Sequence, residues 1–351
     1  MEPNCHNLNV TVVPTIYIKN KINPAYTQSG FTLMELMIAL TLGLLIVAAG
    51  LALFLNSHRS LNFQSGMDEV QQNANFGFSA VTYDLRHTNL NTVSSQRVNS
   101  YTLGSGIVFK KENLPVALRD LTNLETGLVS LHDKDTANTG TAVNKKSDRI
   151  TIQYVPQANT VVNCEGVNVT NASSKVIVQR YYVAASPQQI TGEPTAYSLY
   201  CDAGSYAINT PVTPAVTDPN TIGLGTGAQQ IMQRVDAFKV RLGVKNPAGQ
   251  LRYMTIKQYT DAMDILLTAS ACAVKTATSC TSTFLQVVSI EVGILVRSTG
   301  TIGADAEQNT RTTFNLAGTD VTLSGDANVN KRYLRQAVNQ VVAIRNTLGA
   351  S

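Results

Sequence analysis

The sequence predicts an α+β protein in which one long N-terminal helix precedes a β-rich region. Three observations predict this order. A twenty-residue stretch, Leu36–Leu55, contains no charged side chain. An amphipathic helical pattern follows it without interruption, because no proline occurs between Pro24 and Pro115. After about residue 89 the composition shifts to Thr, Ser, Asn, Val and Gly, and short β-type runs alternate with turn residues.

The uncharged stretch is long enough to cross a membrane as a helix. At about 1.5 Å of rise per residue, twenty residues span the roughly 30 Å hydrocarbon core. The stretch is longer than the apolar core of a signal peptide, and no small-residue cleavage site follows it. Lys19 and Lys21 precede it, so the positive-inside rule places the N-terminus in the cytoplasm. We predict one transmembrane helix; the alternative is an apolar helix buried in a core.

The segment after the apolar stretch continues the helix with an amphipathic pattern. Apolar or small residues recur there at steps of three and four: Val70, Ala74, Gly77, Phe78, Val81 and Leu85. Charged residues lie between them. The pattern predicts one continuous helix from Phe31 to about Thr88.

Beyond the helix, six runs have the composition of β-strands: Gly106–Lys110, Arg149–Val155, Lys175–Ala184, Val240–Val244, Leu285–Val296 and Arg311–Leu316. Segments 134–147 and 202–228 are rich in Thr, Asn, Gly and Pro and are predicted to be long surface loops. A further helix is predicted over Ala228–Phe238, after a glycine-rich turn.

The cysteines favour an exported domain. Cys5 precedes the apolar stretch, and Cys164, Cys201, Cys272 and Cys280 follow it. None of the last four forms a Cys-x-x-Cys pair and no histidine lies near them, so a zinc site is not expected. An oxidising compartment favours two disulfides. Three pairings are possible, and the nearest-neighbour choice is Cys164–Cys201 with Cys272–Cys280; four unpaired buried thiols are the alternative.

No catalytic residues, cofactor or metal site are predicted. The motifs HExxH and GxSxG are missing from the sequence, and the four histidines are isolated from one another: His6, His58, His87 and His132. The net charge of +4 is spread thinly, without a Lys/Arg cluster. Direct nucleic-acid binding is therefore not expected.

Two short motifs resemble ligand loops but lack essential residues. Residues 223–227 (GLGTG) resemble part of a phosphate loop without its Lys-Ser/Thr, and we interpret them as a turn. Asp326, Asn328 and Asn330 alternate as calcium ligands do. Lys331 occupies the position that needs glycine, however, and no distal glutamate follows at the right distance. We interpret this segment as a polar turn.

The most informative segment is residues 29–36 (SGFTLMEL), where the apolar stretch begins. A carboxylate at Glu35 opens the span, and a charge near the centre of a membrane helix is costly. One interpretation is an interfacial residue whose carboxylate reaches headgroup water. The other begins with cleavage between Gly30 and Phe31, which frees an α-amino group with an ordinary pKa of about 7.7–8.0. Glu35 would then neutralise that amine on its own chain or on a packed neighbour.

The motif Gly-Phe-Thr-Leu-x-Glu before a twenty-residue apolar run resembles the class III signal of type IV pilins and type II secretion pseudopilins. Four further segments resemble the PilW-type minor pilins: 71–86 (QQNANFGFSAVTYDLR), 235–244 (VDAFKVRLGV), 286–298 (QVVSIEVGILVRS) and 333–346 (YLRQAVNQVVAIRN). The resemblance covers most of residues 30–346, with the loops at 90–150 and 200–228 unmatched.

The resemblance implies a pilin-like fold, in which the long N-terminal helix, half of it transmembrane, packs on an antiparallel β-sheet with long loops. It divides the chain into a prepilin leader (1–30), a transmembrane half-helix (31–58), an amphipathic half-helix (59–89) and a periplasmic β-rich head (90–351). Prepilin peptidase is then expected to cut after Gly30 and to N-methylate Phe31. Glu35 is expected to supply the carboxylate of the assembly charge pair.

The function implied is that of a non-enzymatic minor pilin that takes part in priming type IV pilus assembly. Its expected partners are prepilin peptidase, other minor pilins, the major pilin and a tip adhesin. It is expected in the inner membrane with a periplasmic head, and then in the fibre near its tip. Two features depart from the pattern: a leader of thirty residues, which questions the start codon, and a chain longer than pseudopilins. The alternatives are a type II secretion pseudopilin and, in another class, a signal-anchored periplasmic enzyme or ligand-binding protein.

Overall fold

The structure is a computed structural model, and its description covers these residues: 30–94, 96–135, 147–208, 216–269, 284–301, 311–323 and 332–347. The leader before Gly30, the polar turn at 326–330, and Cys272 with Cys280 lie outside them. The chain divides into two compact units, Met1–Asn56 and Ser57–Ser351, which are described separately below.

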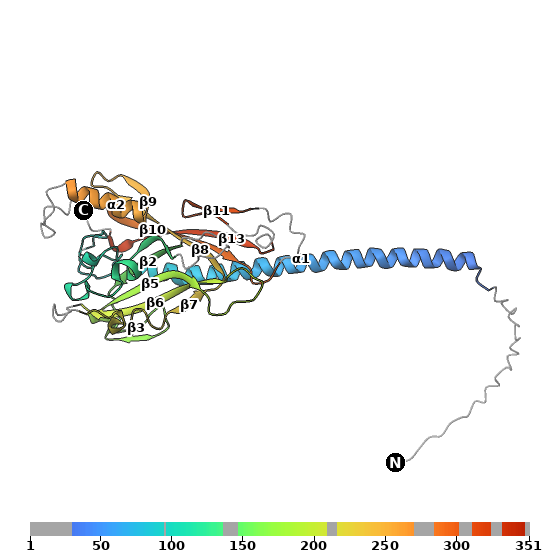
Figure 1. Cartoon of the computed structure of the whole chain (residues 1–351), viewed down its shortest axis with the longest axis horizontal. Helices are drawn as coiled ribbons and strands as arrows, with labels where there is room; N and C mark the ends of the chain where they lie inside the picture. The colour runs from blue at the N-terminus through green and yellow to red at the C-terminus, as the bar shows by residue number, and fades with distance from the viewer. Residues whose placement is uncertain are drawn as a thin grey trace, which may run out of the picture. The chain divides into compact units, whose positions relative to one another are not determined.

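Helix α1 (Leu33–His87) supplies residues to both units (Figure 1). In the first unit its side chains are exposed throughout. The most apolar window of α1 has a mean hydropathy of 2.7, and none of that window is buried. By length and composition this helix can cross a membrane. The alternative interpretation, an apolar helix buried in a core, does not agree with this exposure.

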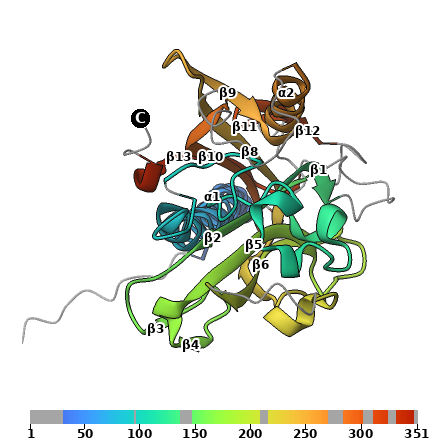
Figure 2. The same cartoon turned by 90° about the vertical axis from the view of Figure 1, so that its left-hand side faces the viewer.

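In the second unit, α1 buries one stripe of side chains. Val70, Ala74, Phe78, Val81 and Leu85 are all buried, at the spacing that the sequence predicts. They belong to one core cluster with residues of two β-sheets. Figure 2 shows the helix with strands of one sheet on one side and strands of the other sheet opposite.

Both sheets are antiparallel. The first has five strands in the order β1 (Leu131–Asp135), β2 (Ser147–Tyr154), β5 (Lys175–Ala185), β6 (Tyr197–Ala207) and β7 (Gln229–Met232). The second has four, in the order β13 (Arg335–Ala343), β10 (Gln286–Arg297), β8 (Val235–Lys245) and β9 (Leu251–Thr255). The predicted α+β class is confirmed, with two sheets in place of one.

Smaller elements complete the second unit. Two hairpins are formed by β3 (Thr160–Val162) with β4 (Asn168–Thr170), and by β11 (Thr313–Leu316) with β12 (Thr319–Thr322). Helix α2 (Ile256–Ala269) follows β9 directly. Single turns of tighter or wider helix occur at Lys111–Asn113, Val116–Leu118, Leu124–Leu128, Ala172–Ser174, Pro219–Ile222 and Arg345–Thr347.

Three local predictions are wrong. The helix predicted over Ala228–Phe238 is instead strand β7 and the start of β8, which enter different sheets through a turn where Arg234 has φ of 53°. The loop predicted from residue 202 begins later, because β6 continues to Ala207. The strand predicted at Gly106–Lys110 is reduced to a single bridge between Ile107 and Ile152.

The end of α1 is tied to distant segments through Asn89, which has φ of 67°. Its side-chain Oδ1 accepts hydrogen bonds from the Gly106 amide at 2.8 Å and the Ser94 hydroxyl at 2.7 Å. Its Nδ2 donates to the Asn346 carbonyl at 3.2 Å. A Cβ on Gly106 would lie 2.4 Å from the Asn89 amide nitrogen, so only glycine allows this approach.

A disulfide joins Cys164, in the loop between β3 and β4, to Cys201 on β6, with 6.1 Å between their Cα atoms. This is the nearest-neighbour pairing expected from the sequence. The adjacent Glu165 carboxylate accepts a hydrogen bond from the Ala203 amide at 2.9 Å. Both contacts attach the β3–β4 hairpin to the first sheet.

Candidate functional site

The segment singled out from the sequence forms the capped start of α1. Glu35 Oε2 accepts from the Thr32 amide at 3.2 Å, and Thr32 Oγ1 accepts from the Glu35 amide at 3.2 Å. The Thr32 carbonyl accepts the first helical hydrogen bond, from the Leu36 amide at 3.1 Å. This reciprocal pair is a capping box, in which the side chains at the N-cap and third positions satisfy two amides that lack helical partners.

The capping box places the predicted cleavage bond outside the helix. Gly30 and Phe31 precede Thr32, and Phe31 is 88% exposed. An accessible peptide outside regular secondary structure is what a protease needs in order to reach the backbone. The sequence interpretation identified Gly30, Phe31 and Glu35 but missed Thr32. The signal for it was present, since Thr-x-x-Glu before an apolar run is a capping-box pattern.

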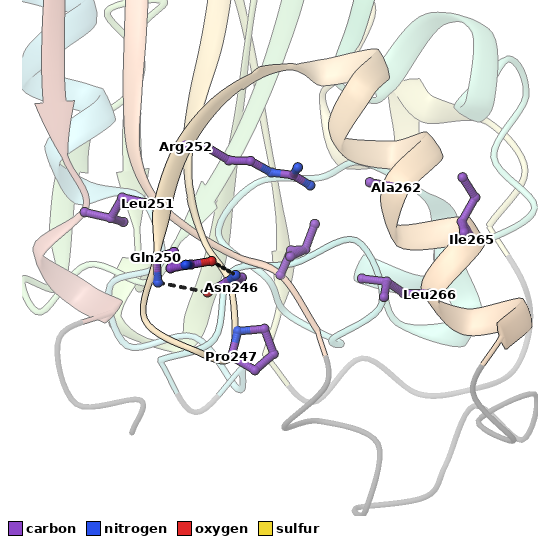
Figure 3. A pocket seen from close by; sticks show the side chains of 9 residues that line it. Asn246, Pro247, Gln250, Leu251, Arg252, Ala262, Ile265 and Leu266 are labelled. Carbon is purple, nitrogen blue, oxygen red and sulfur yellow. Dashed lines mark hydrogen bonds between the residues drawn. The ribbon is translucent and has the colours of Figure 1, made fainter.

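A pocket of about 780 Å³ lies between the β8–β9 turn and α2 (Figure 3). Its walls are largely apolar, and Arg252 is the one ionisable side chain that lines it. The amides of Asn246 and Gln250 bond to each other at 2.9 Å. The described lining therefore contains no acid, base or nucleophile arranged for catalysis.

The glycine-rich turn is occupied by a carboxylate of the protein itself. Gly223, Gly225 and Gly227 all have positive φ, and the Gly225 amide lies 3.0 Å from both carboxylate oxygens of Asp202. Asp202 also pairs with Arg180. The turn therefore supports the first sheet, in agreement with the structural interpretation of this motif. Among the described residues, no group of three or more His, Cys, Asp or Glu side chains is placed to hold a metal ion.

Asp84 is a buried titratable group on α1. Its side chain is 8% exposed and accepts a hydrogen bond from the Tyr181 hydroxyl on β5. Burial raises the pKa of Asp84 to about 6, while the Tyr181 hydrogen bond and the nearby His87 oppose the rise. Burial also raises the pKa values of the neighbouring Tyr154 and Tyr181 hydroxyls, so both stay neutral.

We expect Asp84 to make the stability of the second unit depend on pH. The pKa of Asp84 is about 6 in the folded protein, against an ordinary value of 3.8. In the window between these two pH values the folded protein keeps a proton that the unfolded chain releases. The unfolding free energy should therefore fall as pH rises through the window and then level off. Between pH 5 and 7.5 the loss is about 1.4 kcal/mol.

Urea unfolding of Asp84→Asn at the two pH values measures this dependence, which the substitution should remove. The matched control is Asp68→Asn, an exposed position on the same helix, which should keep the wild-type dependence. An unchanged pH dependence in Asp84→Asn would assign it to other groups.

Two families match the chain. The family described as type IV pilus-assembly protein W, PilW, matches residues 180–346, and the prokaryotic N-terminal methylation motif matches residues 26–51. A solved type IV-like pilin from Thermus thermophilus is similar at 12% identity, with a TM-score of 0.23, over 59% of this chain and 84% of that one. No curated protein matches the sequence. The methylation motif contains the capping box, and the PilW match contains β8, β10 and β13.

Proposed function

Because the chain is a type IV pilus minor pilin of the PilW type, we propose that it takes part in priming fibre assembly after prepilin peptidase removes residues 1–30. The proposal places the apolar half of α1 in the inner membrane and the head in the periplasm. Other minor pilins, the major pilin and a tip adhesin are its partners, and its final position is near the fibre tip.

The observation that carries this proposal is the arrangement at the start of α1. An exposed Gly30–Phe31 bond immediately precedes a capped helix, and that helix begins with a carboxylate and continues as an unburied apolar stretch. Such a stretch needs lipid or the apolar faces of neighbouring helices to cover it. Membrane anchoring before assembly and helix packing after it supply the two environments in turn.

The first test is the mature N-terminus, which we expect at N-methylated Phe31. Intact-mass measurement of the protein from cells with active prepilin peptidase should show residues 1–30 removed and one methyl group added. Gly30→Leu should block the cut, because the peptidase must approach the backbone closely at that position. A mature chain that retains its leader under these conditions would overturn the proposal.

The second test separates the two roles of Glu35. Glu35→Ala should leave cleavage intact but lower recovery of the protein in sheared pili. In the assembled fibre, the Glu35 carboxylate is expected to neutralise the N-terminal amine of a neighbouring subunit. Glu35→Gln keeps an acceptor for the Thr32 amide but removes the charge, so it should be as defective as Glu35→Ala. Thr32→Ala removes the cap and keeps the charge, and it should assemble nearly as the wild type does.

These variants also show which role is wrong. A Glu35→Gln protein at the wild-type level in sheared fibres, beside a poorly recovered Thr32→Ala protein, would limit Glu35 to helix capping. Deletion of the protein should lower the number of pili on the cell. Loss of protein secretion with normal pili would instead favour the pseudopilin alternative.

A further inference from the structure

Strand β13 is the longest of the four edge strands in the two sheets. It has nine residues, whereas β1 and β9 have five each and β7 has four. Among the described residues, β10 is the one strand that forms a backbone ladder with it (Figure 2). The β11–β12 hairpin contacts β13 through side chains, since Asn339 bonds to the Ala317 amide at 2.8 Å and to the Asn315 carbonyl at 3.1 Å. The pairing of β13 with β10 runs from Arg335 to Ala343 with no bulge.

Natural edge strands are usually protected by charge, proline, bulges or short length. Residues 336–343 (QAVNQVVA) contain no charge and no proline. By contrast, β1 (LHDKD) contains three charged residues, and β9 (LRYMT) contains an arginine. Val341, within this uncharged part, is 50% exposed. The edge of β13 therefore lacks the features that prevent pairing with another strand.

The hydrogen-bond register shows which amides of β13 face outward. The Ile344 amide donates to the Val288 carbonyl at 2.9 Å, and the Ser298 amide donates to the Leu334 carbonyl at 2.9 Å. Both bonds continue the register of β13 with β10. In each bond the residue from the C-terminal segment, Ile344 or Leu334, has an even number. In an antiparallel pair, hydrogen-bonded positions alternate with positions whose groups point away.

The odd-numbered residues of β13 thus direct their amides and carbonyls to the open side of the sheet. Past the arginine at its start they are Ala337, Asn339, Val341 and Ala343. They span about 20 Å at the rise of a strand. This row of donors and acceptors matches the backbone of an incoming extended segment.

The direction of β13 argues against a symmetric pair of two copies. Thr299, two residues beyond β10, donates to Glu69 near the start of the buried stripe at 2.8 Å. At the other end, the Asn346 side chain donates to the carbonyl of Thr88 at 3.0 Å. Since Arg297 pairs with Arg335, residues 69–88 of α1 run in the same direction as β13.

Antiparallel pairing of β13 with itself would therefore point the two α1 segments in opposite directions. Both segments lead back to an anchor in the same membrane in the proposed function, so such a pair is excluded before assembly. A strand from a different protein need not be related to β13 by a two-fold axis, so this exclusion does not apply to it.

We propose that the open edge of β13 accepts an extended, uncharged segment of a different subunit of the fibre, which adds a fifth strand to the second sheet. This inference rests on the proposed function. Main-chain hydrogen bonds to residues 337–343 supply the affinity. The side chains of residues 336–343 are apolar or neutral amides, and because none is charged they select a partner segment that is uncharged at its centre.

The test replaces one outward amide. Val341→Pro removes an N–H that faces away from β10, so the existing ladder keeps its hydrogen bonds while an incoming strand loses one and meets the proline ring. Val341→Thr keeps the amide, the side-chain branching and nearly the same size, and is the matched control. The full chain is expressed in its host, and its recovery in sheared pili is measured together with cleavage at Gly30.

We expect cleavage of both variants, wild-type recovery of Val341→Thr and an at least tenfold lower recovery of Val341→Pro. The melting temperature of each variant in detergent is measured in parallel. If Val341→Pro unfolds, Val341→Lys, which places a charge on the same edge position, replaces it. Wild-type recovery of a folded Val341→Pro or Val341→Lys protein would overturn the edge proposal alone.

Two further outcomes are decisive. If the wild-type chain is missing from sheared pili, the proposed function fails, and the edge proposal falls with it. If the detergent-solubilised wild type forms a dimer that Val341→Pro abolishes, the occupant is a second copy and the assignment to a different subunit is wrong. Slower deuterium exchange at the amides of Asn339 and Val341 in fibres than in the solubilised chain would support the proposal.

Discussion

Replacing Asp236 with asparagine should lower the unfolding free energy of the second unit, Ser57–Ser351, by about 3–5 kcal/mol, the largest effect that we expect from a single substitution. Asp236 is 1% exposed on β8. Its carboxylate accepts from Nε of Arg335 on β13 at 2.7 Å and lies 3.9 Å from Nη1 of Arg297 on β10. Without the carboxylate, two buried guanidinium groups lose their compensating charge.

The surroundings of Arg297 show why this cluster is sensitive. Its side chain is fully buried, donates to the Pro194 carbonyl at 3.2 Å, and lies 4.9 Å from the centre of the Tyr333 ring. Burial lowers the pKa of Arg297. The positive charges of Arg335 and Arg234 act in the same direction, and the carboxylate of Asp236 opposes them. Removing Asp236 therefore leaves a buried guanidinium, which stays charged, without the carboxylate that offsets its desolvation.

Urea unfolding of the full chain in detergent measures the effect. The control is Glu291→Gln, which breaks a pair with Arg241 at 2.6 Å whose side chains are 13% and 29% exposed. Because that pair is only partly buried and keeps some contact with water, its loss should cost less, about 1–2 kcal/mol. Equal losses of unfolding free energy in the two variants would show that the Asp236 cluster contributes no more to stability than a partly exposed ion pair.

The second large effect is expected from the disulfide between Cys164 and Cys201. Its sequence separation of 37 residues corresponds to about 4 kcal/mol in the chain-entropy account. Cys164→Ser should therefore lower the melting temperature by about 10 °C for a domain of this size. Cys201 is completely buried, so its unpaired thiol would also remain in the core.

The comparison that tests the entropy account is Cys280→Ser. If Cys272 and Cys280 pair as predicted, they close a loop of only eight or nine residues, and their loss should cost about 2.6 kcal/mol. The melting temperature should fall less than in Cys164→Ser. Equal shifts would contradict this ranking. Peptide mapping under non-reducing conditions decides the pairing of Cys272 and Cys280, and a crosslink of either one to Cys164 or Cys201 would refute it.

The elements that the sequence predicts well are those whose pattern is local and long. Helix α1 was readable because an apolar run of twenty residues joins a stripe at steps of three and four. The strands around Lys175–Ala184 and Leu285–Val296 were readable from continuous β-branched and aromatic residues. Helix α2 was missed although its start carries a signal, since Thr255 and Gln258 form a capping box with bonds at 3.0 and 3.2 Å.

The failures concern contacts between distant segments. The apolar positions of residues 228–238 fit a helix or a strand equally, and pairing of β7 with β6 and of β8 with β10 decides the outcome. The ion cluster needs Asp236, Arg297 and Arg335 to reach one end of a sheet, which depends on the register of three strands. No pattern within one segment contains that register, so neither the cluster nor the open edge of β13 was predictable.

The hydrogen bonds at Asn89 have a mechanical consequence. Tension that reaches the C-terminal end of α1 is passed on through Asn89 and Thr88, which are bonded to Asn346, three residues after β13. Residues 69–88 are parallel to β13, so the force is directed along that strand, while its hydrogen bonds to β10 lie across it. Bonds in this geometry bear load together and do not open one after another. Tension along residues 69–88 would thus load β13 in shear, so that its whole ladder to β10 bears the force at once.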